Sequence, residues 1–156
     1  MAISFSFELP THRVEHPDEF LTAGAIAELA TAAERAGFAA CHVTDHPAPD
    51  GKWLDMGGHH ALDPFVALTA AAAATSTLRL LTNVYIAAYR NPLLSAKSIQ
   101  SLDVVSGGRF ILGTAAGYLK PEFAALGVDF DERNDLFDEA LEVMEAVWAG
   151  GDVAHE

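Results

Sequence analysis

Apolar and polar positions along the chain follow two periods in turn. Residues 3–7 alternate apolar and polar side chains, which predicts a strand with one buried face. His16 and Pro17, followed by two acidic residues, are typical of the first turn of a helix. Apolar side chains then recur at helical spacing, and Gly37 predicts the end of that helix. The chain therefore begins with one β/α unit.

The same alternation occurs three more times. Further strands are predicted at residues 40–44, 78–87 and 110–112. Further helices are predicted from Asp63 and Pro64, from Asn91 and Pro92 to residues 106–108, and around Leu136 with an end at Gly150, and the loop before the last of them has room for a short helix near residues 121–126. This order, βαβαβαβα, favours an α/β fold with a parallel sheet covered by helices. No linker divides residues 1–156, so we expect a single domain.

The composition is that of a folded protein with an excess of acid. The 156 residues include 9 basic and 22 acidic side chains, a formal net charge of −13, and 51% of them are hydrophobic. Wholesale disorder requires low hydrophobicity beside high charge, so it is excluded. Binding to nucleic acid or to an anionic membrane requires clustered basic side chains, so neither is expected as the main partner.

Cysteine usage and the length of the apolar runs indicate the compartment. Cys41 has no second cysteine to pair with, and it lies in an apolar run typical of a core. The longest alanine-rich stretch, residues 65–75, is too short to span a bilayer, and the N-terminus shows no targeting segment. We therefore expect a cytoplasmic protein.

Ligands of parallel α/β proteins collect at the C-terminal ends of the strands, so the residues there form the candidate site. His46 follows the second strand and is the best candidate for acid–base chemistry, because histidine titrates near neutrality. Asp45 is then a candidate to orient the imidazole ring. The alternative is that Asp45 caps the strand end while His46 only packs.

Two further candidates follow the third and fourth strands. Arg90 can meet a phosphate or carboxylate of a ligand, or instead form a salt bridge with an acidic side chain of the protein. Gly113 and Gly117 let the backbone approach a ligand, but their G-x-x-x-G spacing is neither a Rossmann fingerprint nor a P-loop, and a tight turn without a ligand is the alternative. No metal site is expected from the loop histidines, which are His12, His16, His59 and His60.

A long, ordered series of motifs resembles one known family. Its strongest parts are N-P-L-L-S-A-K at residues 91–97 and L-D-V-V-S-G-G-R-F-I-L-G at residues 102–113. The other matches, in chain order, are V-T-D-H at 43–46, D-P-F at 63–65, A-G-Y at 116–118, E-F at 122–123, L-G-V at 126–128 and Arg133. Over nearly its whole length the chain thus resembles the bacterial-luciferase-like family of flavin- and deazaflavin-dependent oxidoreductases.

The resemblance implies a fold and a cofactor site. The family has a (β/α)8 barrel, a TIM barrel, with the flavin or deazaflavin over the C-terminal strand ends. By resemblance, His46 lies near the reacting face of the cofactor ring, and a cis peptide bond joins Asn83 to Val84 behind it. From the strand ends and the resemblance together, the expected catalytic residues are His46 and Asp45, and the expected cofactor-binding residues are Asn83, Val84, Arg90, Gly113, Thr114, Ala115 and Gly117.

The chain departs from the family pattern at three points. Ala115 stands where the family often has glycine, so a Cβ lies where the backbone approaches the cofactor. Ala116 stands where relatives that oxidise sugar phosphates have an acidic glutamate, so we do not expect that activity. The chain also supplies only four of the eight β/α units of a barrel, which typically takes ~250 residues. We therefore expect a half barrel, truncated relative to the family.

The resemblance implies one of two reactions on a small organic substrate. These are hydride transfer with coenzyme F420 and monooxygenation with FMN. The alanine-rich composition with more arginine than lysine indicates a high-GC bacterium, and the resemblance then favours F420, which is common among relatives from such organisms. The open strand edges of a half barrel favour self-association, so we expect a homo-oligomer. Two alternatives remain: a non-catalytic half-barrel module that self-associates, and a truncated, inactive family member.

Overall fold

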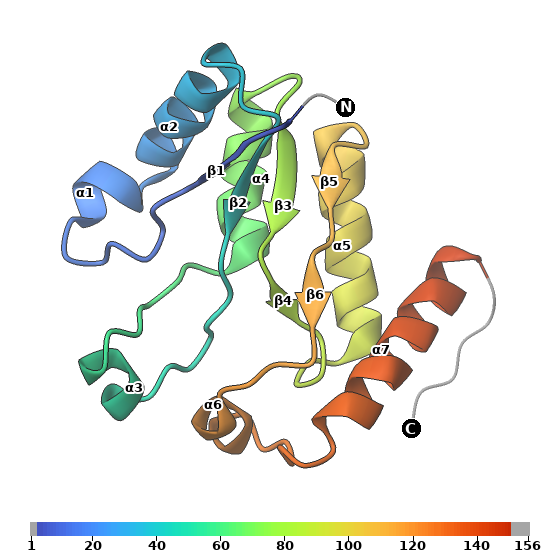
Figure 1. The fold of residues 1–156 in the computed structure, drawn as a ribbon. Helices are drawn as coiled ribbons and strands as arrows, with labels where there is room; N and C mark the ends of the chain where they lie inside the picture. Colours follow the sequence, from blue (N-terminus) through green and yellow to red (C-terminus); the bar gives the residue numbers. More distant parts are fainter. Residues whose placement is uncertain (1–2, 151–156) are drawn as a thin grey trace.

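The computed structural model describes residues 3–150, which alternate between strands and helices (Figure 1). In chain order the elements are β1 (Ser6–Glu8), α1 (Pro17–Phe20), α2 (Ala23–Arg35), β2 (Ala40–Val43), α3 (Gly51–Asp55), α4 (Pro64–Ala74), β3 (Arg79–Thr82), β4 (Tyr85–Ile86), α5 (Pro92–Ser106), β5 (Phe110–Ile111), β6 (Thr114–Ala115), α6 (Lys120–Ala125) and α7 (Arg133–Trp148).

The strands form parallel sheets, as the β/α order predicts. β1, β2, β3 and β5 lie side by side in that order, and β4 pairs with β6 in a second, two-stranded parallel sheet. Each strand of the larger sheet reaches the next through a helical connection, which parallel pairing requires. Figure 1 shows that the short helices α3 and α6 lie at the end of the molecule to which β4 and β6 extend. The predicted parallel α/β architecture is confirmed.

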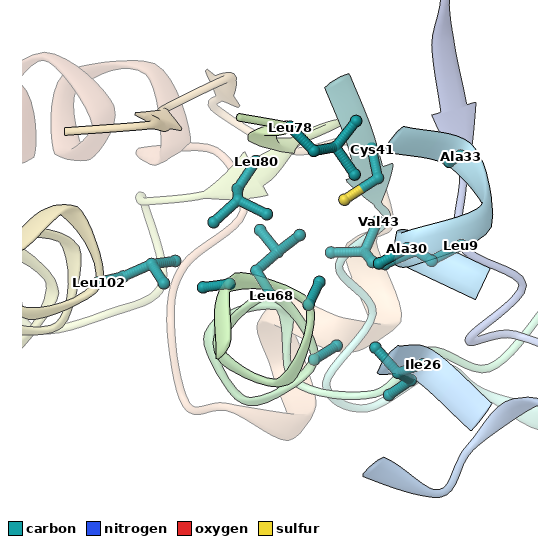
Figure 2. Packing of buried hydrophobic residues seen from close by; sticks show 13 residues of the cluster. Leu9, Ile26, Ala30, Ala33, Cys41, Val43, Leu68, Leu78, Leu80 and Leu102 are labelled. Carbon is teal, nitrogen blue, oxygen red and sulfur yellow. The ribbon is translucent and has the colours of Figure 1, made fainter. Parts of the chain in front are cut away.

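Helices α2, α4 and α5 cover one face of the larger sheet. Cys41 and Val43 of β2 and Leu80 of β3 form one buried cluster with Leu68 of α4 and Ala30 of α2, and none of these side chains is exposed (Figure 2). Removing apolar surface from water stabilises a fold by roughly 25 cal/mol per Å². Burial also raises the pKa of the Cys41 thiol to about 12, so the thiol stays protonated in the core.

Two capped helix starts fix the loops that leave the strand ends. The Asp63 carboxylate accepts hydrogen bonds from the first backbone N–H groups of α4, at 3.0 and 3.1 Å. The Asn91 side chain does the same for α5, at 3.0 and 3.2 Å. In both helices proline occupies the first turn, where a missing N–H costs nothing. The predicted starts of these two helices are confirmed.

The structure differs from the sequence prediction in three segments. The strand predicted at residues 78–87 is two strands, because the chain passes from the larger sheet to the smaller one at residues 83–84. Thr114 and Ala115, expected within a turn, instead form β6, because they pair with β4. The first helix is also interrupted, since α1 ends at Phe20 and α2 begins after its own cap, Thr22.

The opposite face of the larger sheet carries a row of partly exposed side chains. Register places Glu8, His42, Leu81 and Ile111 side by side across the four strands. β1 and β5 are the edges, each with one neighbouring strand among the described residues. Pairing of these edges with a second copy stays a prediction, as does the cytoplasmic location. Within residues 3–150, no helix combines the length and the apolar character needed to cross a bilayer.

Glu34 ties the end of α2 to the start of β3. One of its carboxylate oxygens accepts hydrogen bonds from the backbone N–H groups of Ser76 (2.9 Å), Thr77 (2.6 Å) and Leu78 (2.8 Å), and from the Thr77 hydroxyl (2.9 Å). These donors, above all the N–H of Thr77, lower the pKa of Glu34 to about 2. The charged carboxylate therefore holds the turn that leads into β3.

Replacing the carboxylate with an amide tests this contact. We expect Glu34→Gln to lower the free energy of unfolding at pH 7 by roughly 1 kcal/mol, allowing for the partial exposure of the side chain. Because the folded pKa lies below the ordinary 4.5, the contribution is fully present above pH 4.5 and is lost as the pH falls through about 2.

Thermal unfolding from pH 7 down to pH 2 measures the difference between the two proteins. Glu28→Gln, at an exposed position of the same helix, is the matched control and should change little. A difference between Glu34→Gln and the wild type that does not shrink in acid would contradict this account.

Candidate functional site

A cavity of about 200 Å³ lies at the C-terminal ends of the strands. Its walls come from four places: the segment after β2, the β3–β4 junction, β4 with the turn after it, and the chain that runs from β6 into α6. Its polar and aromatic lining includes Thr44, Asp45, His46, Tyr89, Tyr118 and Glu122. This is the end of a parallel sheet at which ligands are expected.

Asp45 anchors the wall of this cavity. Its side chain is 1% exposed, and Arg90 donates to both carboxylate oxygens, at 2.7 and 2.8 Å. The backbone N–H of Ile86 donates to the same carboxylate at 3.0 Å. These partners occupy Asp45, so the structure shows no contact between its carboxylate and the His46 ring. Asp45 thus joins the end of β2 to β4 and to the turn before α5.

Arg90 is held in place by this ion pair and by two aromatic rings. Its guanidinium carbon lies 4.4 Å from the ring centre of Tyr85 and 5.0 Å from that of Tyr89. A further N–H donates to the carbonyl of Ile86 at 2.9 Å. Of the two uses that the sequence leaves open, the structure shows the salt bridge within the protein. Contact of Arg90 with a cofactor stays a prediction.

His46 pairs with a buried carboxylate from a distant part of the chain. Its Nδ1 lies 3.2 Å from Oε2 of Glu122, in the first turn of α6. The other oxygen of Glu122 accepts the backbone N–H of Ala48, also at 3.2 Å. The side chains of His46 and Glu122 are 10% and 3% exposed. The imidazole and its carboxylate partner thus both lie in the wall of the cavity.

Aromatic rings surround the His46 imidazole. The ring centres of Trp53, His59 and Tyr118 lie 4.4, 5.0 and 6.2 Å from that of His46. Trp53 is on α3, a short helix that the sequence analysis does not predict, and the Asp50 side chain caps this helix by accepting the Trp53 N–H at 3.2 Å. These rings shield one side of the imidazole from water.

The peptide bond between Asn83 and Val84 is cis, as the family resemblance implies. Both residues line the cavity. Val84 also packs against a buried cluster that contains Ile86 and Phe123. The bond lies at the point where the chain leaves β3 for β4, so its backbone forms part of the cavity wall.

The glycine-rich segment after β5 is largely engaged within the protein. The Gly113 N–H donates to the Thr82 hydroxyl at 3.0 Å, and the Thr114 hydroxyl donates to the Tyr85 carbonyl at 2.7 Å. A Cβ at position 113 would lie 2.2 Å from the carbonyl oxygen of Thr82, so only glycine fits between these strands. Gly117 lines the cavity. Cofactor contacts of Gly113, Thr114 and Ala115 stay predictions.

Two buried hydroxyls at the cavity fit a polar ligand. Thr44 Oγ1 and Tyr89 OH have no hydrogen-bond partner among the described residues, and both residues line the cavity. Burial, together with the nearby Asp45 carboxylate, raises the pKa of Tyr89, so its hydroxyl remains a donor. A buried hydroxyl without a partner is costly, and a ligand with polar ring atoms would satisfy both groups. The cavity therefore fits the edge of a flavin or deazaflavin ring.

The roles of Glu122 and Trp53 do not follow from the sequence. Glu122 stood within a matched motif, but no local spacing links it to His46, which lies 76 positions away. Trp53 lay in a loop without hydrophobic periodicity. Among residues 3–150, no cluster of three or more histidine, cysteine, aspartate or glutamate side chains has the arrangement of a metal site.

Comparison with known proteins identifies the family of this chain. The model of the luciferase-like monooxygenase family matches residues 2–156, and the chain is a member of that family. The F420-dependent glucose-6-phosphate dehydrogenase of Beutenbergia cavernae is 38% identical over 123 residues, which are 76% of this chain and 35% of that protein. The predicted family membership is confirmed.

Solved structures of similar proteins contain the same fold. The monooxygenase RslO1 from Streptomyces bottropensis matches with a TM-score of 0.80 and 31% identity, over 99% of this chain and 45% of that one. The oxygenating constituent of 3,6-diketocamphane monooxygenase from Pseudomonas putida, in complex with FMN, matches with a TM-score of 0.81 at 21% identity, over 100% of this chain and 42% of that one. The chain therefore has the fold of part of a luciferase-like barrel and spans less than half of these relatives.

Removing the charge of Asp45 tests its role as the anchor. Asp45→Asn leaves the half-buried guanidinium of Arg90 without its counter-charge, which costs about 3 kcal/mol of unfolding free energy. Urea denaturation at pH 7 measures this loss. Asp138→Asn, at an exposed position of α7, is the matched control. If both variants stayed within about 0.5 kcal/mol of the wild type, Asp45 would not anchor the site.

Proposed function

We propose that this chain forms the cofactor-binding and proton-transferring part of a luciferase-like oxidoreductase that uses the deazaflavin coenzyme F420 with a small organic substrate. The observation that carries the proposal is the buried His46–Glu122 pair in the wall of a cavity at the strand ends. The F420-dependent relative at 38% identity supports the choice of cofactor. FMN with molecular oxygen is the alternative chemistry, supported by the monooxygenase at 31% identity.

The cavity offers the ring of the cofactor both polar and apolar contacts. Thr44 Oγ1 and Tyr89 OH would hydrogen-bond to its polar edge, and the backbone at Asn83 and Val84 would lie against its face. When bound, F420 accepts or donates a hydride. The protein contributes the position of the ring and the handling of the accompanying proton.

His46 is the group suited to move that proton. When an alcohol is oxidised to a carbonyl, its C–H bond is lost as a hydride and its O–H bond as a proton. His46, in neutral form, can accept the proton at a ring nitrogen and become an imidazolium ion. The carboxylate of Glu122 at 3.2 Å then stabilises the new positive charge.

The rings around His46 contribute by excluding water. Trp53 packs against the imidazole at 4.4 Å, and the side chain of His46 keeps only 10% of its surface exposed. Tyr118, an exposed residue that also lines the cavity, has its ring centre 6.2 Å from that of His46. A shielded imidazole exchanges its proton with bound substrate in preference to bulk water.

Titration of the purified chain with F420, and separately with FMN, tests this proposal. We expect F420 to bind, with a change in its absorbance and fluorescence. Binding of FMN alone would favour the oxygen-dependent alternative. Binding of neither cofactor would overturn the proposal, and light scattering on the same sample would then show whether the chain is a self-associating module.

Removal of the Thr44 hydroxyl, which has no hydrogen-bond partner among the described residues, tests where the cofactor binds. Thr44→Val keeps the volume of the side chain and breaks no hydrogen bond within the described residues, so the protein should fold with undiminished stability. Loss of a contact to the bound cofactor should weaken F420 binding roughly tenfold.

Thr69→Val, at an exposed position of α4, is the matched control and should bind like the wild type. Equal affinity of Thr44→Val and the wild type would place the cofactor away from Thr44.

A further inference from the structure

We propose that Glu122 is a positioning residue that fixes the tautomer of His46, so that the ring carries hydrogen on Nδ1 and presents an unprotonated Nε2 to the cavity. The catalytic use of this tautomer rests on the proposed function. The tautomer itself is a property of the chain without any cofactor.

The carboxylate of Glu122 is buried between two segments of the chain. Glu122 is 2% exposed, although it stands in the first turn of a short helix on the surface of the molecule. Its two oxygens point to two different partners, the ring of His46 and the backbone of Ala48. Both partners belong to the segment that follows β2, so Glu122 joins α6 to that segment.

Both oxygens of Glu122 accept hydrogen bonds. The backbone N–H of Ala48 can only donate, and it donates to Oε1. A carboxylate can only accept, so the atom that faces Oε2 must supply a hydrogen. That atom is His46 Nδ1, at 3.2 Å. Neutral His46 is therefore held with its hydrogen on Nδ1, and Nε2 keeps its lone pair.

The other groups around the His46 ring leave Glu122 as its acidic partner. The groups that face His46 are Trp53, His59 and Tyr118, which contact it as rings. The Nδ1 of His59 lies 3.0 Å from the carbonyl of His60, which occupies that nitrogen. Asp45, the acidic residue that precedes His46 in the chain, forms an ion pair with Arg90. Among the described residues, Glu122 is thus the acid that contacts the His46 ring, and Nε2 has no hydrogen-bond partner.

This arrangement matters for the direction of proton transfer. Free histidine favours hydrogen on Nε2, which would make the nitrogen that is not paired with Glu122 a donor. With hydrogen on Nδ1, that nitrogen is an acceptor, which is what removal of a proton from an alcohol requires. Glu122 acts on the substrate only through His46, in the same way as other carboxylates that fix the tautomer of a catalytic histidine.

Nuclear magnetic resonance of the chain labelled with ¹⁵N and ¹³C in histidine tests the proposal, with the His46 signal assigned from a His46→Gln sample. We expect neutral His46 of the wild type to show hydrogen on Nδ1. In Glu122→Gln the single amide oxygen accepts from Ala48, and the amide NH₂ group faces Nδ1. The major tautomer should therefore switch to hydrogen on Nε2.

Glu142→Gln on the exposed face of α7 makes the same change of charge and should leave the His46 signal unchanged. Hydrogen on Nε2 in the wild type would overturn the proposal, and that result needs no variant to fold. An unchanged tautomer in a folded Glu122→Gln protein would also overturn it. If F420 and FMN both fail to bind, the proposed function falls, but the tautomer assignment is decided independently.

Discussion

The carboxylate of Asp45 is the contact on which this end of the molecule depends. It leaves the end of β2 and meets Arg90 and the N–H of Ile86, so one side chain joins three segments of the chain. Each charge would be costly without the other, since an unpaired ion in a poorly hydrated site loses several kcal/mol of solvation. Tyr85 and Tyr89 cover the guanidinium and help to keep water away from the pair. The wall of the cavity takes its shape from this arrangement.

A second buried carboxylate, Glu122, serves the same region differently because its partner is different. Arg90 keeps its proton under all ordinary conditions, so its pair with Asp45 is a permanent structural element. A neutral imidazole, unlike a guanidinium, can accept a proton, so the pair of His46 with Glu122 places a proton acceptor in the cavity wall. The Asp45–Arg90 ion pair thus holds the cavity, and the hydrogen-bonded His46–Glu122 pair supplies a group able to take part in chemistry there.

Local patterns were sufficient to predict the order of elements and part of the site. The Asp63 and Asn91 caps depend on neighbours in sequence, and the structure confirms them. The alternation at residues 3–7 predicted one buried face, but Ile3 and Phe5 are 83% and 68% exposed and β1 begins at Ser6. The position of His46 at a strand end followed from the same reasoning. The contacts that give the site its character cross long stretches of chain: Arg90 lies 45 positions from Asp45, and Glu122 lies 76 from His46. No periodicity reaches so far.

The sequence by itself determined a parallel α/β fold, the family, and the strand ends at which a ligand would bind. Hydrophobic period, capping residues and ordered motifs are properties of short segments, and they survive without knowledge of the fold. Only the tertiary structure decided that Asp45 pairs with Arg90 rather than with His46, and that Glu122 is the partner of the imidazole. The physical reason is that these contacts join segments that are far apart in the chain. The path of the backbone decides which carboxylate lies within hydrogen-bond distance of Arg90 or of His46, and burial shields that contact from water.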